Sequence, residues 1–375
     1  MGEARDVILM CGDNPVMRIN FSTLVYNVIN EKLLPYGIKG KLRKQPTPTG
    51  DVKYDAIQLS IASDKNRAAV VSWFANRTLL LSRANAKWIY NALNIDQLDT
   101  EMQKLKVSFI CRSVSVLDSY WVKLDGDSSS WDKIDVRRNH LNETIAQIAL
   151  HGKSVTIQGS LATPELTTNG AYAKAWRRHE DGLWLYKLGH NGSFESKIEV
   201  MVSKILDKTN VDHVPYVAGT DDGKYVCMCP CISTDKLSIL PAMEYSSYCN
   251  VNGLDFDKEV LRIDKDRFYK MWIVDYIISN RDRHSQNWGF FYDRDTMEVV
   301  STHPLFDHNN AFDIEYMRDR NAVYQCSGKS LRESAKYAMT QTDFKITDKI
   351  VREDFLTERQ YNEFVWRARD LGLTI

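Results

Sequence analysis

Charge of one sign is not in excess in this chain of 375 residues, because 49 lysines and arginines balance 49 aspartates and glutamates. The balance gives no direct signal for a nucleic-acid partner. No apolar run approaches the roughly 18 residues that span a bilayer. The segment Met1–Asp6 has neither the apolar core of a signal peptide nor the serine or threonine of a myristoylation site. We therefore expect a cytoplasmic protein that does not bind a membrane.

Cysteine is present in an odd number, seven, which in a chain of this length favours reduced thiols over a disulfide framework. Three of the cysteines form the run Cys227-Met-Cys229-Pro-Cys231, which lacks the Cys-x-x-Cys spacing of a zinc site. Alternate residues of a strand face the same side. We therefore interpret these thiols as packed small hydrophobic groups rather than metal ligands.

Residues 1–155 match no catalytic pattern, and we expect them to form an α+β module with a structural or recruiting role. The chain contains no internal repeat and no low-complexity tract. In this N-terminal module the expected strands are Asp6–Met10 and Ala56–Ile61, the expected helices are Ser82–Leu93 and Leu141–Leu150, and the basic, proline-containing segment Lys39–Gly50 is an expected mobile loop.

The most informative pattern is Ser279-Asn-Arg-Asp-Arg-His-Ser-Gln-Asn287, followed by Pro304-Leu-Phe-Asp307. It places a carboxylate at Asp282, an amide oxygen five residues later at Asn287, and a second carboxylate at Asp307. Phosphoryl transfer from a nucleotide needs an acid that accepts a hydroxyl proton and two oxygen ligands that hold magnesium against the phosphates. Taken alone, an Asp and an Asn at this spacing also occur as loop caps and turn residues.

The elements around this pattern are also typical of a kinase. Apolar residues at near-helical spacing predict a helix over 266–279, and two strands are expected at 288–292 and 297–301. A helix, a catalytic loop, a hairpin and then a metal-binding Asp is the order found in the large lobe of a kinase. A further helical stretch, 358–369, is expected to complete that lobe.

Three features upstream fit a small lobe. The segment Thr167–Lys174 predicts a glycine-containing turn followed by a strand, and Lys187 ends a second strand, where its ammonium can reach phosphate oxygens. Glu199 follows twelve residues later on a predicted helix and is expected to pair with Lys187. Glu195, one turn earlier, is the alternative. Glu199 is favoured because it adjoins the apolar stripe of the helix.

Residues from about 157 to 340 resemble the HipA-like serine/threonine kinases, which share the Asp-Arg-His-x-x-Asn motif with the phosphatidylinositol kinases. The matching segments are Thr167-Thr-Asn-Gly-Ala-Tyr-Ala-Lys, Leu185-Tyr-Lys, Glu199-Val-Met-Val-Ser-Lys, Val211-Asp-His-Val-Pro-Tyr, Asp275-Tyr-Ile-Ile-Ser-Asn-Arg-Asp-Arg-His and Pro304-Leu-Phe-Asp. The resemblance implies an α+β, two-lobed protein-kinase-like fold with ATP and Mg²⁺ between the lobes. The implied small and large lobes are residues 156–235 and 236–375.

The same resemblance assigns roles to individual residues. Asp282 is the expected catalytic base, with Lys187 and Glu199 as further catalytic residues, and Asn287 and Asp307 are the expected magnesium ligands. The nucleotide is expected to contact Lys187 and the turn residues Thr167, Thr168, Asn169, Gly170 and Lys174. In several kinases of this kind the hydroxyl residues of the turn are themselves phosphorylated. The alternative role of Thr167 and Thr168 is to hydrogen-bond the turn backbone.

The pattern departs from conventional kinases at two positions. His308 stands near where the Gly of Asp-Phe-Gly is usual. The turn has one glycine where three are common, which restricts the approach of the backbone to the phosphates. Neither change removes a metal ligand or the base.

The sequence therefore predicts an ATP- and Mg²⁺-dependent serine/threonine protein kinase that acts on a protein substrate. The alternatives are a lipid or small-molecule kinase, an enzyme that transfers AMP, and a nucleotide-binding scaffold without turnover. A toxin role, known for some members of the family, would require an antitoxin-like regulator.

Overall fold

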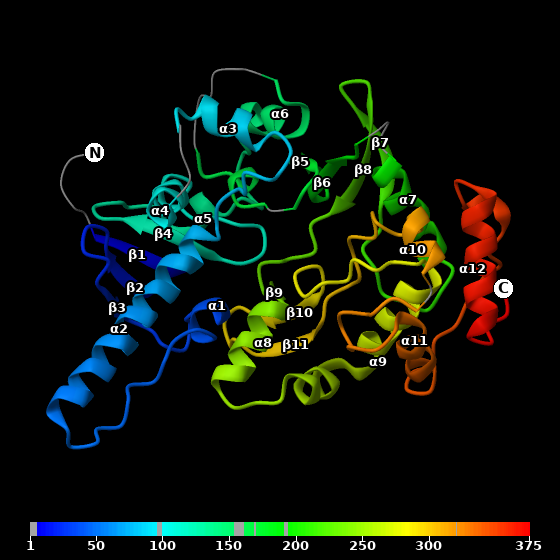
Figure 1. Cartoon of the computed structure of the whole chain (residues 1–375). Helices are drawn as coiled ribbons and strands as arrows, with labels where there is room; N and C mark the ends of the chain where they lie inside the picture. The colour runs from blue at the N-terminus through cyan, green and yellow to red at the C-terminus, as the bar shows by residue number, and fades with distance from the viewer. Residues whose placement is uncertain (1–5, 96–99, 154–160, 169, 191–193, 320) are drawn as a thin grey trace.

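The computed structural model describes residues 6–95, 100–153, 161–168, 170–190, 194–319 and 321–375. Within these residues the chain forms an α+β fold, in which helices surround three antiparallel sheets (Figure 1). None of the described helices has the length and apolar character needed to cross a membrane.

The first sheet belongs to the N-terminal module. Its strand order is β3-β2-β1-β4, with bounds Tyr26–Val28, Asn14–Asn20, Asp6–Cys11 and Tyr120–Leu124. The long helix α2 (Val52–Ala75) packs against α4 (Glu101–Ile110), and both contribute aromatic residues to the core beside the sheet. The shorter helices of this module are α1 (Tyr36–Lys39), α3 (Ala86–Ala92), α5 (Trp131–Ile134) and α6 (Glu143–His151).

The strand predicted at Ala56–Ile61 is wrong, because these residues lie within α2. Asp51 caps the helix, and its carboxylate accepts hydrogen bonds from the main-chain N–H groups of Lys53 and Tyr54. The alternating apolar residues of this stretch do not mark a buried sheet face, since Ile57, Leu59 and Ile61 are exposed. The helix expected from Ser82 begins later, at Ala86, after the N-cap residue Asn85.

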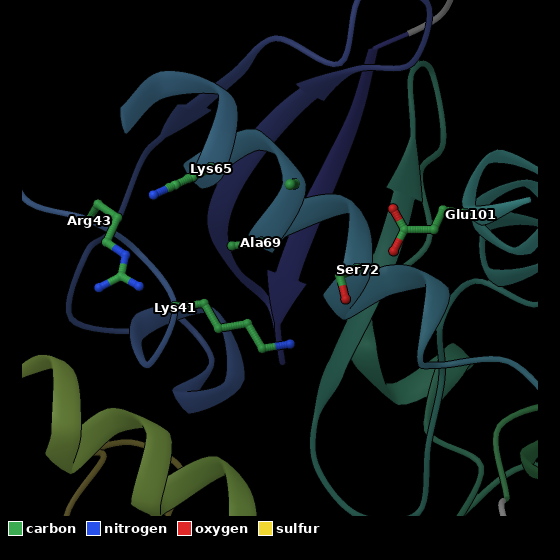
Figure 2. Close-up of a pocket in the computed structure, with 7 residues that line it drawn as sticks. Lys41, Arg43, Lys65, Ala69, Ser72 and Glu101 are labelled. Atoms are coloured by element: carbon green, nitrogen blue, oxygen red, sulfur yellow. The ribbon is translucent and has the colours of Figure 1, made fainter. Parts of the chain in front are cut away.

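The segment that was expected to be a mobile loop is irregular from Leu42 to Gly50, and it is attached to α2 at two points. Arg43 exchanges two hydrogen bonds with the side chain of Asn66, and Asp55 accepts from the main-chain N–H groups of Thr49 and Gly50. Between this segment, α2 and the start of α4 lies a hollow of about 360 Å³ (Figure 2). Its lining residues are Lys41, Arg43, Lys65, Ala68, Ala69, Ser72 and Glu101, none of which belongs to the sequence motifs.

The second sheet has the order β5-β6-β8-β7, with bounds Ala173–His179, Gly182–Leu188, Lys224–Pro230 and Val217–Asp221. Helix α7 (Phe194–Leu206) packs on it and buries the apolar stripe predicted from the sequence, including Ile198 and Ile205. The short helix η1 (Pro164–Leu166) precedes the glycine turn. Cys227 and Cys229 are buried on β8, as expected for packed thiols.

The third sheet, β11-β10-β9, has bounds Val299–Thr302, Gly289–Asp293 and Leu237–Pro241. Helix α9 (Phe256–Ile277) leads into the loop that contains Asp282. The helical geometry breaks at Asp264, so the predicted helix over 266–279 corresponds to the second part of α9. The remaining helices are α8 (Ala242–Val251), α10 (Ile314–Arg318), α11 (Leu331–Met339), η2 (Arg352–Asp354) and α12 (Glu358–Asp370).

The N-terminal module shares a core with the rest of the chain. One cluster of buried apolar residues runs from the first sheet into α9 and the third sheet. The hydroxyl of Tyr36 donates to the carbonyl of Met297 at 2.5 Å, and the main-chain N–H of Ile239 donates to the carbonyl of Leu117 at 2.7 Å. The module is therefore packed against the β9–β11 sheet rather than attached by a linker alone.

Candidate active site

The buried ammonium group of Lys187 lies between two carboxylates. Its Nζ is 2.8 Å from Oε1 of Glu199 on α7 and 3.0 Å from Oδ1 of Asp307, and it also donates to the hydroxyl of Tyr216 at 3.1 Å. The Glu199 side chain is 1% exposed and that of Asp307 is 29% exposed. Glu199 is thus fixed inside the protein, whereas Asp307 keeps a carboxylate oxygen accessible to a ligand.

The charged forms of Lys187 and Asp307 stabilise each other. Burial by itself disfavours a charged Lys187, but Asp307 and Glu199 outweigh this cost and hold the pKa of Lys187 well above its ordinary value. Burial would also raise the pKa of Asp307, but the ammonium groups of Lys187 and Lys174 hold it well below the usual range. The cluster therefore contains charged lysine and aspartate at neutral pH.

The loop after α9 brings Asp282 and Asn287 together. Nδ2 of Asn287 donates to the main-chain carbonyl of Asp282 at 2.6 Å, and Nδ2 of Asn310 donates to the Asp282 carboxylate at 2.6 Å. These contacts fix which way the Asn287 amide points. Its Oδ1 is buried and has no hydrogen-bond partner among the described residues. A buried amide oxygen without a partner is costly unless a ligand completes it.

A second charged centre, missed by the sequence analysis, supports this loop. The carboxylate of Asp275 accepts two hydrogen bonds from Arg283, one from Asn280 and one from the hydroxyl of Tyr324, at 2.6 to 3.1 Å. Asp275 and Arg283 are both fully buried. An aspartate on an apolar helix is the sequence signal that could have identified Asp275, since an isolated buried carboxylate requires a partner.

Arg283 extends from this centre to both parts of the motif. Its Nη1 donates to the main-chain carbonyls of Asn287 at 2.9 Å and Phe306 at 2.7 Å. One guanidinium group therefore fixes the spacing between the Asp282–Asn287 loop and the segment that carries Asp307. The planar fork of arginine suits this role, because its donors diverge at fixed angles.

His308 directly follows Asp307, near the position where conventional kinases have glycine, and it connects the two charged centres. Its main-chain N–H donates to Oε2 of Glu199 at 2.9 Å, and its ring Nδ1 lies 3.2 Å from Nη2 of Arg283. Burial and the adjacent Arg283 hold the pKa of His308 well below its ordinary value, so the ring is neutral. The preceding residue, Asp307, has a left-handed φ of +61°. This conformation is uncommon outside glycine, although aspartate adopts it more readily than most residues.

The glycine turn lies beside Lys187. Lys174 on β5 is directly opposite Lys187 on β6, and a Cβ added to Gly170, at φ +110°, would lie 2.2 Å from the Lys174 Nζ. Burial and the repulsion from Lys187 lower the pKa of Lys174 to about 7. The glycine therefore lets the backbone of the turn contact an amine that is half protonated near neutral pH.

The threonine hydroxyls of the turn are used inside the protein. Thr167 donates to the carbonyl of Val114 at 2.7 Å, and Thr168 donates to the carbonyl of Pro164 at 2.7 Å. These contacts correspond to the backbone-holding role rather than to free acceptor hydroxyls. Asn169, also predicted to contact the nucleotide, lies outside the described residues.

The oxygen donors of the site fit a magnesium ion. Mg²⁺ prefers oxygen ligands and is usually held by one or two protein side chains together with phosphate oxygens and water. The Oδ1 of Asn287, which has no partner in the described part of the chain, and the accessible carboxylate of Asp307 are donors of this kind. Lys187 thus contacts Glu199 and Asp307, and Arg283 joins the Asp282–Asn287 loop to the segment directly before Asp307.

No family model matches the chain, and no curated protein matches its sequence. Solved structures with a similar fold include HipA of Shewanella oneidensis MR-1, from the toxin–antitoxin complex of HipA, HipB and operator DNA. That match has a TM-score of 0.48 and 10% identity, over 97% of this chain and 95% of that chain. The Helicobacter pylori proinflammatory kinase CtkA matches with a TM-score of 0.38 and 13% identity, over 53% of this chain and 90% of that chain.

The buried pair of Asp275 and Arg283 provides a stability test. Replacing Asp275 by Asn leaves the guanidinium buried without its counter-charge, and removing one partner of a buried pair costs about 3 to 5 kcal/mol. We expect the free energy of unfolding of Asp275→Asn, measured by urea denaturation, to fall by about 3 kcal/mol. The matched control is Asp64→Asn, since Asp64 pairs with Arg67 on the surface, and there the loss should stay below about 1 kcal/mol. Equal losses in the two variants would contradict the supporting role of Asp275.

Proposed function

We propose that this chain is an ATP- and Mg²⁺-dependent phosphotransferase of the HipA-like kinase type, which phosphorylates a serine or threonine hydroxyl of a cytoplasmic protein. The observation that carries the proposal is the contact of Lys187 with Glu199 and with the accessible carboxylate of Asp307. Arg283 joins this segment to Asn287, whose amide oxygen has no partner among the residues that the structure describes. In this proposal residues 156–235 and 236–375 act as the small and large lobes, and residues 1–155 form an additional module.

The ammonium groups of the site suit the phosphates of the nucleotide. Lys187 is held by Glu199 and would offset the negative charge that develops on the transferred phosphoryl group. Lys174 and the backbone near Gly170 would contact the phosphates from the turn. Bound Mg²⁺ would supply further charge neutralisation, and Asn287 and Asp307 are the residues that would hold it.

Asp282 is the proposed base. Its carboxylate accepts a hydrogen bond from Asn310, which leaves further lone pairs available for an acceptor hydroxyl. As the hydroxyl oxygen forms its bond to the γ-phosphorus, the proton passes to Asp282 and the bond from phosphorus to the β–γ bridging oxygen breaks, releasing ADP. The contact between Asn287 and the Asp282 carbonyl keeps the base and the metal ligand at a fixed separation.

The role of Asp282 is tested by Asp282→Asn. We expect kcat for label transfer from ATP to fall about a thousandfold, within the range lost with a general base, while nucleotide affinity changes little. Asp125→Asn, at an exposed turn residue, is the control and should keep full activity. Intact mass spectrometry identifies the adduct, and an added AMP in place of a phosphate would reject this function. Equal transfer by Asp282→Asn and the unaltered protein would show that Asp282 is not the base.

The lowered pKa of Lys174 predicts a proton linkage. With a pKa of about 7 in the free protein, Lys174 is largely neutral at pH 8, and adjacent phosphate oxygens would favour its charged form. Nucleotide binding at pH 8 should therefore take up a proton, and affinity should fall as the pH rises from 7 to 9.

Calorimetry in buffers of different ionisation enthalpy measures this uptake directly. Lys174→Met should abolish it, whereas Lys197→Met, at an exposed lysine of α7, should leave it unchanged. Uptake that persists in Lys174→Met would assign the proton to another group.

A regulator of the antitoxin kind is part of the proposal, on the strength of the HipA-like resemblance. Expression of the unaltered chain should then arrest bacterial growth, and Asp307→Ala, which removes a proposed metal ligand, should relieve the arrest. Colony counts after induction measure both effects. Normal growth on expression of the unaltered chain would reject the toxin role. The kinase assignment would then be decided by the transfer assay alone.

A further inference from the structure

Arg83, in the N-terminal module, makes hydrogen bonds to both arms of the glycine turn. Its Nη1 donates to the main-chain carbonyls of Glu165 at 3.1 Å and Thr168 at 2.6 Å, and its Nη2 donates to the carbonyl of Lys174. The side chain comes from the segment between α2 and α3 and is 3% exposed. One guanidinium group therefore joins the chain before Gly170 to the chain after it.

Two further contacts attach the same turn to the N-terminal module. The main-chain N–H of Ala84 donates to the carbonyl of Ala171 at 2.9 Å, and the Thr167 hydroxyl donates to the carbonyl of Val114. The module thus holds the turn before Gly170, at Thr167 and Thr168, and after it, at Ala171 and Lys174. The shared core and these contacts place the module next to the proposed nucleotide site.

The geometry of the guanidinium group determines what this contact can do. Its donors lie in one plane and diverge at fixed angles, so the group bonds several carbonyls only at one separation of the two arms. That separation sets where Gly170 and the Lys174 amine lie relative to each other. Burying a cation among neutral carbonyls is costly, and the electrostatic attraction of the buried Glu165 offsets only part of the cost.

We propose that Arg83 is a positioning residue for the nucleotide, and that the N-terminal module is a structural part of the nucleotide site. Arg83 fixes the separation of the two arms of the glycine turn, and so places the turn backbone and Lys174 for the phosphates of ATP. This inference rests on the proposed function for its ligand. Of the structural and recruiting roles expected for the module, it favours the structural one and names the turn that the module holds.

The test compares Arg83→Met with a matched variant, Arg178→Met. Arg178 lies near the far end of β5 and also donates to three main-chain carbonyls of the N-terminal module, those of Val136, Arg137 and Asn139. We expect Arg83→Met to raise both KM for ATP and the Kd of a non-hydrolysable Mg-ATP analogue about tenfold, equal to about 1.4 kcal/mol. Its kcat should stay within about threefold of the unaltered protein, and Arg178→Met should leave all three constants unchanged.

Arg83→Lys provides the intermediate case. Lysine keeps the charge and the length but lacks the planar fork, so it cannot hold both arms at a set separation. Its Kd for the analogue should lie between those of the unaltered protein and Arg83→Met. If Arg83→Met does not fold, as judged by circular dichroism, the same comparison is made with Arg83→Lys against Arg178→Lys.

Hydrogen exchange separates this inference from the proposed function. Amides of residues 170–174 should exchange faster in Arg83→Met than in Arg178→Met, with no nucleotide present. If the unaltered protein neither binds nor turns over ATP, the proposed function and the nucleotide role of Arg83 both fail, while faster exchange would still show that Arg83 holds the turn. Nucleotide affinity equal to the unaltered protein in Arg83→Met, or an equal loss in Arg178→Met, would overturn the inference.

Discussion

A buried ammonium group must be neutralised, and the arrangement of the site follows from how this chain neutralises Lys187. Burying an isolated charge would cost many kilocalories per mole, so carboxylates must lie within contact distance. One comes from helix α7 as Glu199, and the other comes from the segment after β11 as Asp307. The two carboxylates belong to elements more than 100 residues apart in the chain. The charge requirement of one lysine therefore holds the β5–β8 sheet against the loops that carry the remaining motif residues.

Asp275 and Arg283 form a second buried pair of opposite charges. His308 contacts both this pair and the Lys187 cluster. Glu199 uses one carboxylate oxygen for Lys187 and the other for the main-chain N–H of His308. The ring of His308 in turn contacts Arg283, which holds the main chain on both sides of the motif. A phenylalanine at position 308, as in Asp-Phe-Gly, could supply the main-chain N–H but no ring nitrogen for Arg283. The histidine therefore adds a contact between the Asp307 segment and Arg283.

One contact of the site, between Lys187 and Glu199, could be predicted from the sequence. The pairing of Lys187 with Glu199, rather than with Glu195, followed from the apolar stripe of α7, which fixes the direction of each side chain. Local pattern failed at Ala56–Ile61, because alternating apolar residues predict a strand only where one face is buried, and here both faces are exposed. Arg83 could not be predicted at all, since its partners are main-chain carbonyls more than 80 residues away and carbonyls leave no sequence signal.

The single glycine of the turn and the buried Arg83 are best understood together. A turn with three glycines lets the backbone approach phosphates closely, but each glycine adds conformational entropy that must be lost when the ligand is bound. A turn with one glycine approaches less freely, so it gains most from being held in the required shape before the ligand arrives. Arg83, Ala84 and Val114 supply that restraint from outside the turn. On the proposed function, the restraint from the N-terminal module compensates for the reduced glycine content of the turn.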